Sequence, residues 1–515
     1  MRRFICAILG AIFLAGPMRG LAAPARHVII ISIDGLHEAD LTDSATSALL
    51  PNIIALAHDG IWYKNASCTH PSDSFPGTLA YLTGAGPAST GVYYDDTFCR
   101  SLVGPGGDAD SPMGTQVRLT AAIDRQPRMF SGGGDFDATS IDPAKIPLDP
   151  ARHFAPVFPH SYLKVSTIFE IVHAAGLRTV LLEKHPSYAI ASGPSGAGVD
   201  DMYCPEIDAP VALIDGKLVD GFSAAAGTRL EQIIHNLPMV MAYDDLKVAA
   251  LLREIGGQDW RGRPRFGAPG LAVLNLQTVN IGQKSLAGGI DQSGGAEIVS
   301  RELTDALHHA DGDIASIVLK LHAAGIWDDT LIFLTAKHGN SPRIGTATVA
   351  GGGRILTTLK AAGIELAGYT QDQIGLYWLA DGSQTARAAQ ILLALRDGPD
   401  NPGIDQILWA DSLKAAGLAG PSDRTPDLVL TARPGMFLLD LLSKRAEHGA
   451  LNEEDTHVPL ILCGGVVASR HGVVVVEQVK STQIAVTALR ALGLDESALQ
   501  GAKAEHTHVL PRSGM

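Results

Sequence analysis

The stretch HVIIISIDG, residues 27–35, determines the fold class that this sequence predicts. All but one of residues 28–33 are β-branched and apolar, whereas a strand with one wet face would alternate apolar and polar residues. The run therefore predicts a strand buried on both faces, and it stops at Asp34. A helical pattern follows at residues 49–58. A buried strand followed by a helix is the repeating unit of a parallel sheet covered by helices.

The same alternation recurs along the chain. It predicts an α/β fold with a central, mostly parallel sheet and helices on both faces. We expect a single domain over residues 26–515, with loop insertions near residues 104–158 and 186–265, because no repeat or low-complexity tract divides it. Further strands are expected at residues 179–182, 271–276, 330–335, 426–431 and 458–463, and further helices at residues 165–175, 298–324 and 482–492.

The composition is that of a globular protein. Of the 515 residues, 46% are hydrophobic and 18% are charged, which excludes a disordered chain. The formal net charge of -14 argues against binding to a nucleic-acid polymer, which needs a basic surface. A local cationic site on an acidic protein can still attract a small anion. The composition therefore leaves a small anionic substrate open.

The N-terminus has the layout of a secretory signal peptide. Two arginines at residues 2–3 precede an apolar run at residues 4–16, and small residues follow at 22–25. The alternative is a membrane anchor, but the run is shorter than the ~20 residues that span a bilayer. We expect residues 1–25 to be cleaved, and we expect a periplasmic or secreted protein with no stable membrane insertion afterwards.

Four cysteines lie beyond this leader, at positions 68, 99, 204 and 463. An even number in an exported protein permits disulfides, and Cys68 with Cys99 is the first pairing to expect. The alternative is that they are small buried hydrophobic residues.

Two segments near predicted element ends carry candidate reactive groups. Asp34 directly follows the apolar strand, and a carboxylate buried there needs a metal or a cation as partner, unless it only caps the next helix. Ser74 precedes Phe75-Pro76, and proline is favoured at a helix start. A helix N-terminus favours a phosphate or an alkoxide. The alternative for Ser74 is a helix cap without chemistry.

Basic and histidine side chains follow later strands. Lys337-His338 comes after the strand predicted at 330–335, and His448 is followed nine residues later by His457. A lone histidine usually has a structural role. The four segments together, in this order, favour one site.

This combination resembles the alkaline phosphatase superfamily, most closely its type I phosphodiesterase/nucleotide pyrophosphatase branch. The resemblance implies an alkaline phosphatase-like fold. It implies that Asp34, His338 and His448 are metal ligands and that Ser74 is the nucleophile. The implied reaction is hydrolysis of phosphate mono- or diesters through a covalent phosphoryl- or nucleotidyl-enzyme, assisted by two zinc ions.

The sequence departs from the family pattern at the metal site. Lys337 stands where the family has an aspartate, and Val279 and Gln283 stand where it has an aspartate and a histidine, if Gly282 aligns with the family glycine. Only one of three family carboxylates remains, so two divalent ions would repel each other without compensation. We expect at most one divalent ion, zinc, or none, with Lys337 as an electrostatic substitute. The expected ligands are Asp34, His338, His448 and His457.

The substrate contacts are expected from other segments. Either Asp95 or Asp96 lies roughly where relatives bind a phosphate oxygen through an asparagine, and Asn280 is the nearest oxygen ligand after the middle strand. Lys184-His185 follows another predicted strand and could bind an anion, or form a loop held by its own hydrogen bonds. The expected substrate-binding residues are Asp95, Asn280, Gln283, Lys184 and His185.

Two functions follow from these residues. The first is a phosphate-ester hydrolase acting through Ser74 and Lys337. The alternative is a non-catalytic descendant of the same fold that binds an anion or a partner in the old cleft.

Overall fold

A computed structural model describes residues 24–264, 267–291, 298–343, 351–439 and 444–515. The leader predicted at residues 1–25 therefore lies almost wholly outside the described residues. Among the described residues, no helix combines the length and apolarity needed to cross a bilayer.

The central sheet has eight strands and is mostly parallel, as predicted. Only β23 runs antiparallel to its two neighbours, β2 and β16. The strand order is β24 (Val473–Val475), β2 (Ile61–Tyr63), β23 (Leu460–Cys463), β16 (Thr330–Thr335), β1 (His27–Ile33), β13 (Leu271–Leu276), β8 (Thr179–Leu182) and β9 (Asp201–Tyr203).

Strand β1 lies in the middle of this sheet and is buried on both faces. Its side chains alternate between two hydrophobic cores, with Val28 and Ile30 in one and Ile29 and Ile31 in the other. Ser32 pairs in register with Asn275 on one side and with Thr335 on the other. Because all three strands are parallel, their carboxyl ends meet at one edge, and the residues after them converge there.

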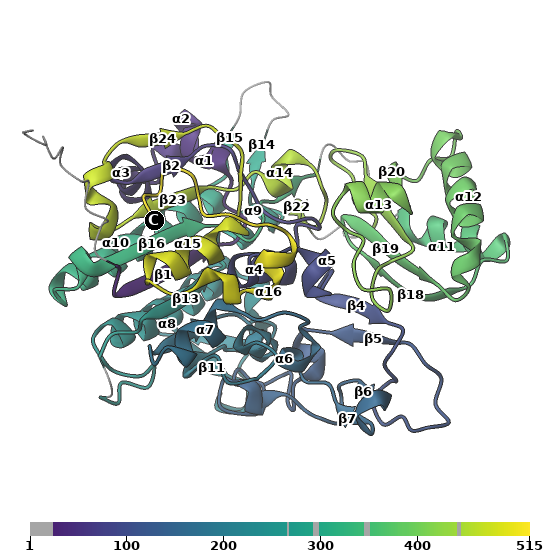
Figure 1. Ribbon diagram of the computed structural model, residues 1–515, viewed down its shortest axis with the longest axis horizontal. Coiled ribbons are helices and arrows are strands. Elements are labelled where there is room, and N and C mark those ends of the chain that lie inside the picture. The colour runs from purple at the N-terminus through teal and green to yellow at the C-terminus, as the bar shows by residue number, and fades with distance from the viewer. Residues whose placement is uncertain (1–23, 265–266, 292–297, 344–350, 440–443) are drawn as a thin grey trace, which may run out of the picture.

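Helices cover both faces of the sheet (Figure 1). One face packs against α3 (Pro51–Asp59), α8 (Leu237–Ile255) and α10 (Arg301–Ala323). The other packs against α4 (Ser74–Thr83), α7 (Ile168–Ala174) and α15 (Gln483–Ala491). The helices predicted at 165–175, 298–324 and 482–492 are present to within one turn at each end.

A smaller antiparallel sheet lies beside the central one, in green in Figure 1. It forms its own hydrophobic core, and its strand β18 contacts β4 (Asp96–Cys99) and β5 (Thr115–Arg118). The strand predicted at 426–431 belongs to this sheet rather than to the central one. The elements are β18 (Leu366–Gln371), β19 (Ile374–Leu379), β21 (Leu428–Ala432), β20 (Ile404–Leu408), α11 (Gly351–Ala361) and α12 (Thr385–Asp397).

The expected disulfide between Cys68 and Cys99 is wrong. All four cysteines of the described residues are free and buried. Cys68 packs into the core on one face of the central sheet and Cys99 into the core on the other, so the sheet separates their sulfur atoms. They behave as small hydrophobic residues.

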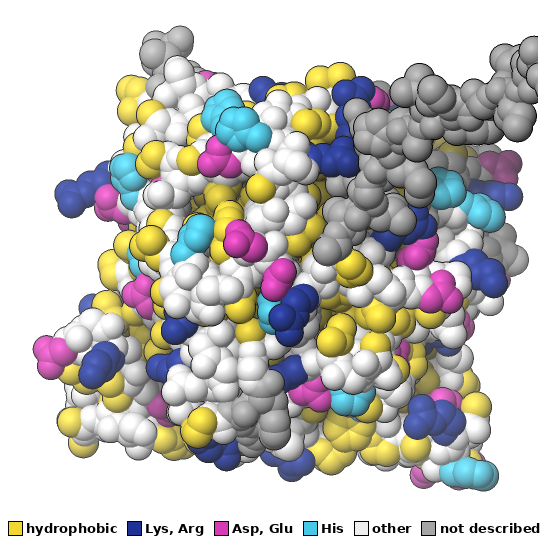
Figure 2. Space-filling view, turned by 60° about the vertical axis from the view of Figure 1, so that its left-hand side comes forward, with side chains coloured by type: hydrophobic (Ala, Val, Ile, Leu, Met, Phe, Trp, Pro, Cys, Tyr) yellow, Lys and Arg dark blue, Asp and Glu magenta, His cyan; other side chains and the backbone are white. Residues whose placement is uncertain are grey.

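The surface agrees with the acidic composition. On the face drawn in Figure 2, the described Lys and Arg side chains are scattered among acidic and apolar ones and form no continuous basic patch.

Candidate active site

The carboxylate of Asp34 is the centre of the site and is fully buried. Its Oδ1 accepts hydrogen bonds from Asn275 Nδ2 at 2.7 Å and from Ser32 Oγ at 3.2 Å. Its Oδ2 accepts one from Gln277 Nε2 at 2.6 Å. These donors stand on β1 and at the end of β13, so the strand register described above positions them. They hold the carboxylate in one orientation.

Two buried ammonium groups share Asp34. The Nζ atoms of Lys184 and Lys337 lie 3.4 Å and 3.7 Å from Asp34 Oδ2. Burial alone would raise the pKa of Asp34, but the charges of Lys337 and Lys184 outweigh it and hold that pKa well below its usual value. Asp34 is therefore an ionised carboxylate with two cationic neighbours.

Lys337 does not block the nucleophile. Its ammonium lies closer to Glu183, with Nζ 2.8 Å from Glu183 Oε1, and it donates to the Tyr188 hydroxyl at 3.2 Å. Burial lowers the pKa of Lys337, and Asp34 and Glu183 counteract this. Lys337 thus lies between the carboxylates of Asp34 and Glu183, and no hydrogen bond between Lys337 and Ser74 is present among the described residues.

Ser74 is the first residue of α4, and it is not the helix cap. Asp73 caps the helix, because its Oδ1 accepts the Phe75 N–H at 3.1 Å. The Ser74 hydroxyl is therefore available for other contacts: Lys184 Nζ donates to its Oγ at 2.8 Å, and His338 Nε2 lies 3.2 Å from it.

Gly77 allows α4 to approach the end of β16 this closely. A Cβ at position 77 would stand 2.5 Å from the carbonyl oxygen of Lys337. Any side chain there would push the helix away and separate Ser74 from His338. The glycine two residues after Phe75 thus has a packing role in the site.

His338 is neutral and its Nε2 faces Ser74. Its Nδ1 lies 2.9 Å from the carbonyl oxygen of Gly339, which can only accept, so Nδ1 carries the proton. Burial lowers the pKa of His338 to about 3. The negative charge of Asp34 acts to raise this pKa, but the effect of burial is larger. Nε2 therefore has a free lone pair 3.2 Å from Ser74 Oγ and 3.9 Å from Asp34 Oδ2.

His448 packs on this histidine, with the ring centroids of His338 and His448 3.7 Å apart. Burial and the positive charges around it hold the pKa of His448 well below its usual value. Its neighbour Glu447 forms ion pairs with Lys284 and Lys444. The described residues give the buried His448 Nδ1 no hydrogen-bond partner.

Acidic side chains gather beside the nucleophile. Burial raises the pKa of Asp73 to about 6. Burial and the charges of Asp73 and Asp96 raise the pKa of Asp95 well above its usual value. Asp372, from the turn after β18, has a pKa raised to about 8 by burial and by Glu447, and Tyr94 donates to it at 3.3 Å. This side of the site disfavours additional negative charge.

The structure brings together six of the residues named from the sequence: Asp34, Ser74, Lys184, Lys337, His338 and His448. Lys184, expected to bind substrate, contacts the nucleophile candidate itself. Glu183, Asn275 and Gln277 were missed. Asn275 could have been found from the sequence, because it is the one polar residue inside the apolar strand Leu271–Leu276.

The remaining named residues lie in other contacts. Asn280 and Gln283, on α9 (Thr278–Lys284), accept hydrogen bonds from Asn340 Nδ2 at 3.1 and 2.7 Å. His457 Nε2 lies 2.9 Å from the Lys64 carbonyl oxygen. His185 Nδ1 lies 2.8 Å from Glu206 Oε1.

The residues around Asp34 do not fit the two-zinc centre that the resemblance implies. Both oxygens of Asp34 are taken by amide donors and ammonium groups, and Val279 is packed in the hydrophobic core. Among the described residues, two groups of three potential ligands have atoms within 4.8 Å of one another, and neither contains Asp34, His338 or His448. Lys337 and Val279 stand at the two positions where the resemblance implies further carboxylate ligands.

Comparisons with known proteins agree with the fold. The family model for type I phosphodiesterase/nucleotide pyrophosphatase matches residues 28–451. No curated protein matches the chain.

Solved structures share the fold at low identity. Murine ectonucleotide pyrophosphatase/phosphodiesterase 5, an inactive form in complex with AMP, gives a TM-score of 0.57 at 12% identity, over 92% of this chain and 96% of that one. The human protein of the same name gives 0.53 at 10% identity, over 91% and 95%. Phosphonoacetate hydrolase from Sinorhizobium meliloti 1021, in complex with phosphonoformate, gives 0.52 at 16% identity, over 93% and 96%.

Proposed function

The chain belongs to the type I phosphodiesterase/nucleotide pyrophosphatase family of hydrolases, and we propose that it hydrolyses phosphate esters with Ser74 as nucleophile and with ammonium groups in place of the two zinc ions. One observation carries this proposal. Ser74 Oγ lies at once 2.8 Å from Lys184 Nζ and 3.2 Å from the neutral Nε2 of His338. A hydroxyl between a cation and a free lone pair is prepared to lose its proton.

His338 is the general base of the proposed reaction. The Ser74 proton passes to Nε2 as Oγ attacks phosphorus and the bond to the leaving oxygen breaks, and that oxygen takes a proton from solvent. Water then attacks the phosphoserine and loses a proton to solvent, while His338 returns its proton to Oγ. Asp34, 3.9 Å from Nε2, stabilises the imidazolium, and a bound phosphate raises the pKa of the ring further.

Lys184 and Lys337 supply the positive charge that metals supply elsewhere in the family. Lys184 stabilises the developing alkoxide on Ser74, and Asp34 holds both ammonium groups in position. Because these charges are fixed by buried partners, little reorganisation accompanies the reaction. The contact between Ser74 Oγ and His338 Nε2 supports catalysis over simple anion binding, because a site that only binds an anion needs no base beside a serine hydroxyl.

We propose that the substrate is a small phosphodiester outside the cytoplasm. The raised pKa values of Asp73, Asp95 and Asp372 indicate that this side of the site resists further negative charge. A diester carries one negative charge and a monoester close to two, so the diester is the better fit.

Removal of metal tests the proposal. Full-length protein dialysed against a strong chelator should hydrolyse a nitrophenyl phosphodiester at 25 °C within about twofold of untreated protein, because no step passes through an ion. Metal content is measured in the same samples. A loss of about tenfold or more that zinc restores would overturn the metal-free mechanism. No turnover of any phosphate mono- or diester, with the protein still stabilised by phosphate, would favour the non-catalytic alternative.

The pH profile tests the assignment of His338. Its pKa of about 3 in the free protein means that the base is protonated only below that pH, so kcat/KM should show no acidic limb between about pH 5 and 8. The charged groups that face the ring are Asp34, Lys184 and Lys284, and the titratable imidazole of His448 packs on it. An acidic limb in kcat/KM near pH 6.5, the pKa of an unperturbed histidine, would show that the pKa of the base is not lowered as proposed for His338.

A further inference from the structure

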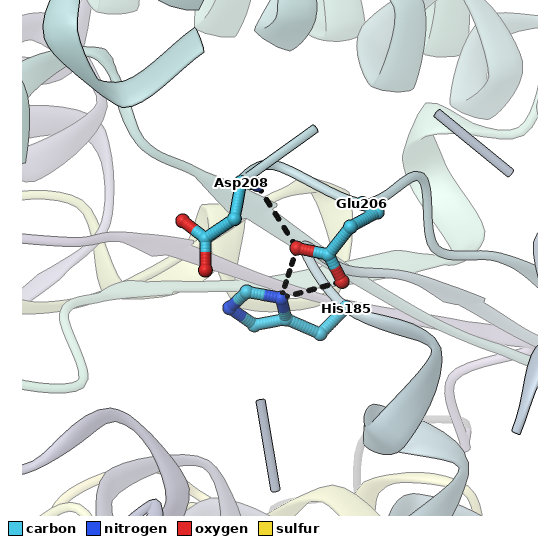
Figure 3. A group of neighbouring side chains, drawn as sticks. All are labelled: His185, Glu206 and Asp208. Carbon is cyan, nitrogen blue, oxygen red and sulfur yellow. Dashed lines mark hydrogen bonds and ion pairs between the residues drawn. The ribbon is translucent and has the colours of Figure 1, made fainter. Parts of the chain in front are cut away.

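A second buried cluster of metal-ligating side chains lies outside the proposed reaction. It consists of His185, just after β8, and Glu206 and Asp208, in the loop after β9 (Figure 3). One ligand atom of each lies within 4.8 Å of the others. His185 Nδ1 is 2.8 Å from Glu206 Oε1 and 3.0 Å from Oε2, and the Asp208 N–H donates to Oε1 at 2.9 Å.

Asp124 adds a third carboxyl group to this cluster. It is fully buried, and its side chain faces that of Glu206. Among the described residues, no donor other than that facing carboxyl contacts its two oxygens. Lys145 is close, but its Nζ donates to the Asp124 backbone carbonyl, at 2.5 Å. Two buried carboxyl groups that face each other repel when both are ionised, and a cation beside them would remove that repulsion.

His185 supplies the nitrogen ligand of this cluster, because a neutral imidazole has a lone pair on one ring nitrogen. Figure 3 shows the Asp208 carboxylate on the side of the ring's second nitrogen, and Glu206 on the side of Nδ1. One ring nitrogen and two carboxylate oxygens, all within 4.8 Å of one another, are a ligand set suited to zinc or manganese.

We propose that His185, Glu206 and Asp208 bind one divalent transition-metal ion, Zn²⁺ or Mn²⁺, with the carboxylate of Asp124 supplying further negative charge beside it. The ion offsets the repulsion among the buried carboxylates of Asp124 and Glu206 and the half-buried carboxylate of Asp208. It also joins two loop segments, one containing Asp124 and one containing Glu206 and Asp208, to the end of β8. This role is structural and separate from the reaction at Ser74.

A second group of this kind, Asp245, His309 and Asp313, provides a contrast. Neighbouring acids raise the pKa of His309 to about 9 despite its burial, so its ring is protonated at neutral pH and pairs with Asp245 at 3.3 Å. A protonated imidazole has no lone pair to offer a metal. This group serves as the matched control.

The test uses metal-stripped full-length protein, thermal unfolding and titration calorimetry, with ZnCl₂, MnCl₂ and MgCl₂ added singly. We expect Zn²⁺ or Mn²⁺ to bind at about one ion per chain and to raise the Tm. Asp208→Asn should remove both effects, and Asp313→Asn should keep both. Glu206→Gln should also remove the binding while raising the Tm of the metal-free protein, because it relieves the repulsion with Asp124.

Two results would overturn the proposal: no binding of Zn²⁺ or Mn²⁺, or equal binding in Asp208→Asn and Asp313→Asn. Folding of each variant is verified by its unfolding transition. Turnover at 25 °C in Asp208→Asn should equal that of the parent protein, which separates this site from the reaction at Ser74.

Discussion

Ser74→Ala should reduce phosphodiester hydrolysis by about 10⁴-fold or more, close to the background rate, because it removes the nucleophile and leaves only binding and electrostatic stabilisation. The measurement is kcat/KM with a nitrophenyl phosphodiester. In the parent protein, acid quenching during turnover followed by mass spectrometry should find a phosphoryl or nucleotidyl adduct on the peptide that contains Ser74. The variant should show no adduct.

Ser140→Ala is the matched control for this substitution. Ser140 is as buried as Ser74, but its hydroxyl donates to the Ser131 carbonyl at 2.7 Å in a loop outside the site. The control should keep the parent kcat/KM with at most a small loss of Tm. A Ser74→Ala protein that is folded and retains more than about a tenth of the parent activity would contradict the nucleophile assignment.

Lys184→Met should reduce kcat/KM by about 10²- to 10³-fold, the usual effect of removing one donor that stabilises developing negative charge. The Lys184 ammonium donates to Ser74 Oγ at 2.8 Å and lies 3.4 Å from Asp34 Oδ2. Methionine keeps much of the volume and removes the charge. Most of the loss should fall on kcat, since the alkoxide forms only in the reaction.

Two further variants make the result specific. Lys64→Met removes a lysine whose ammonium lies over the Trp62 ring, 4.2 Å from its centroid, and should leave kcat/KM unchanged. Lys184→Arg keeps the charge in a longer, planar group and should recover part of the lost activity. If Lys184→Met affects only KM, the ammonium binds the substrate and does not activate Ser74.

The sequence predicted the central sheet well because its signal is local. Apolar runs such as residues 271–276 and 330–335 contain everything needed to recognise a buried strand, and β13 and β16 occupy those residues. Which sheet a strand joins is not a local property. The strand predicted at 426–431 therefore gave no indication that β21 pairs with β19 and β20 in a separate sheet.

The candidate site was predicted as a set of residues but not as a network. Asp34, Ser74 and Lys337 follow recognisable local patterns, and the structure brings them together. Gln277 and Asn275 contact Asp34 only because β13 pairs in register with β1, across more than 200 residues of sequence. Lys184 reaches Ser74 from β8, on the far side of β13 from β1, which no local pattern could indicate.

The position of β1 in the sheet also governs how the chain can fold. His27 pairs with Thr330 and Val28 with Leu271, so β1, the first of the described strands, acquires its neighbours only after more than half of the chain is available. Such distant pairing costs loop-closure entropy and slows folding. Until then β1 exposes unpaired edges that can pair with other chains. Refolding yield should therefore fall steeply with protein concentration.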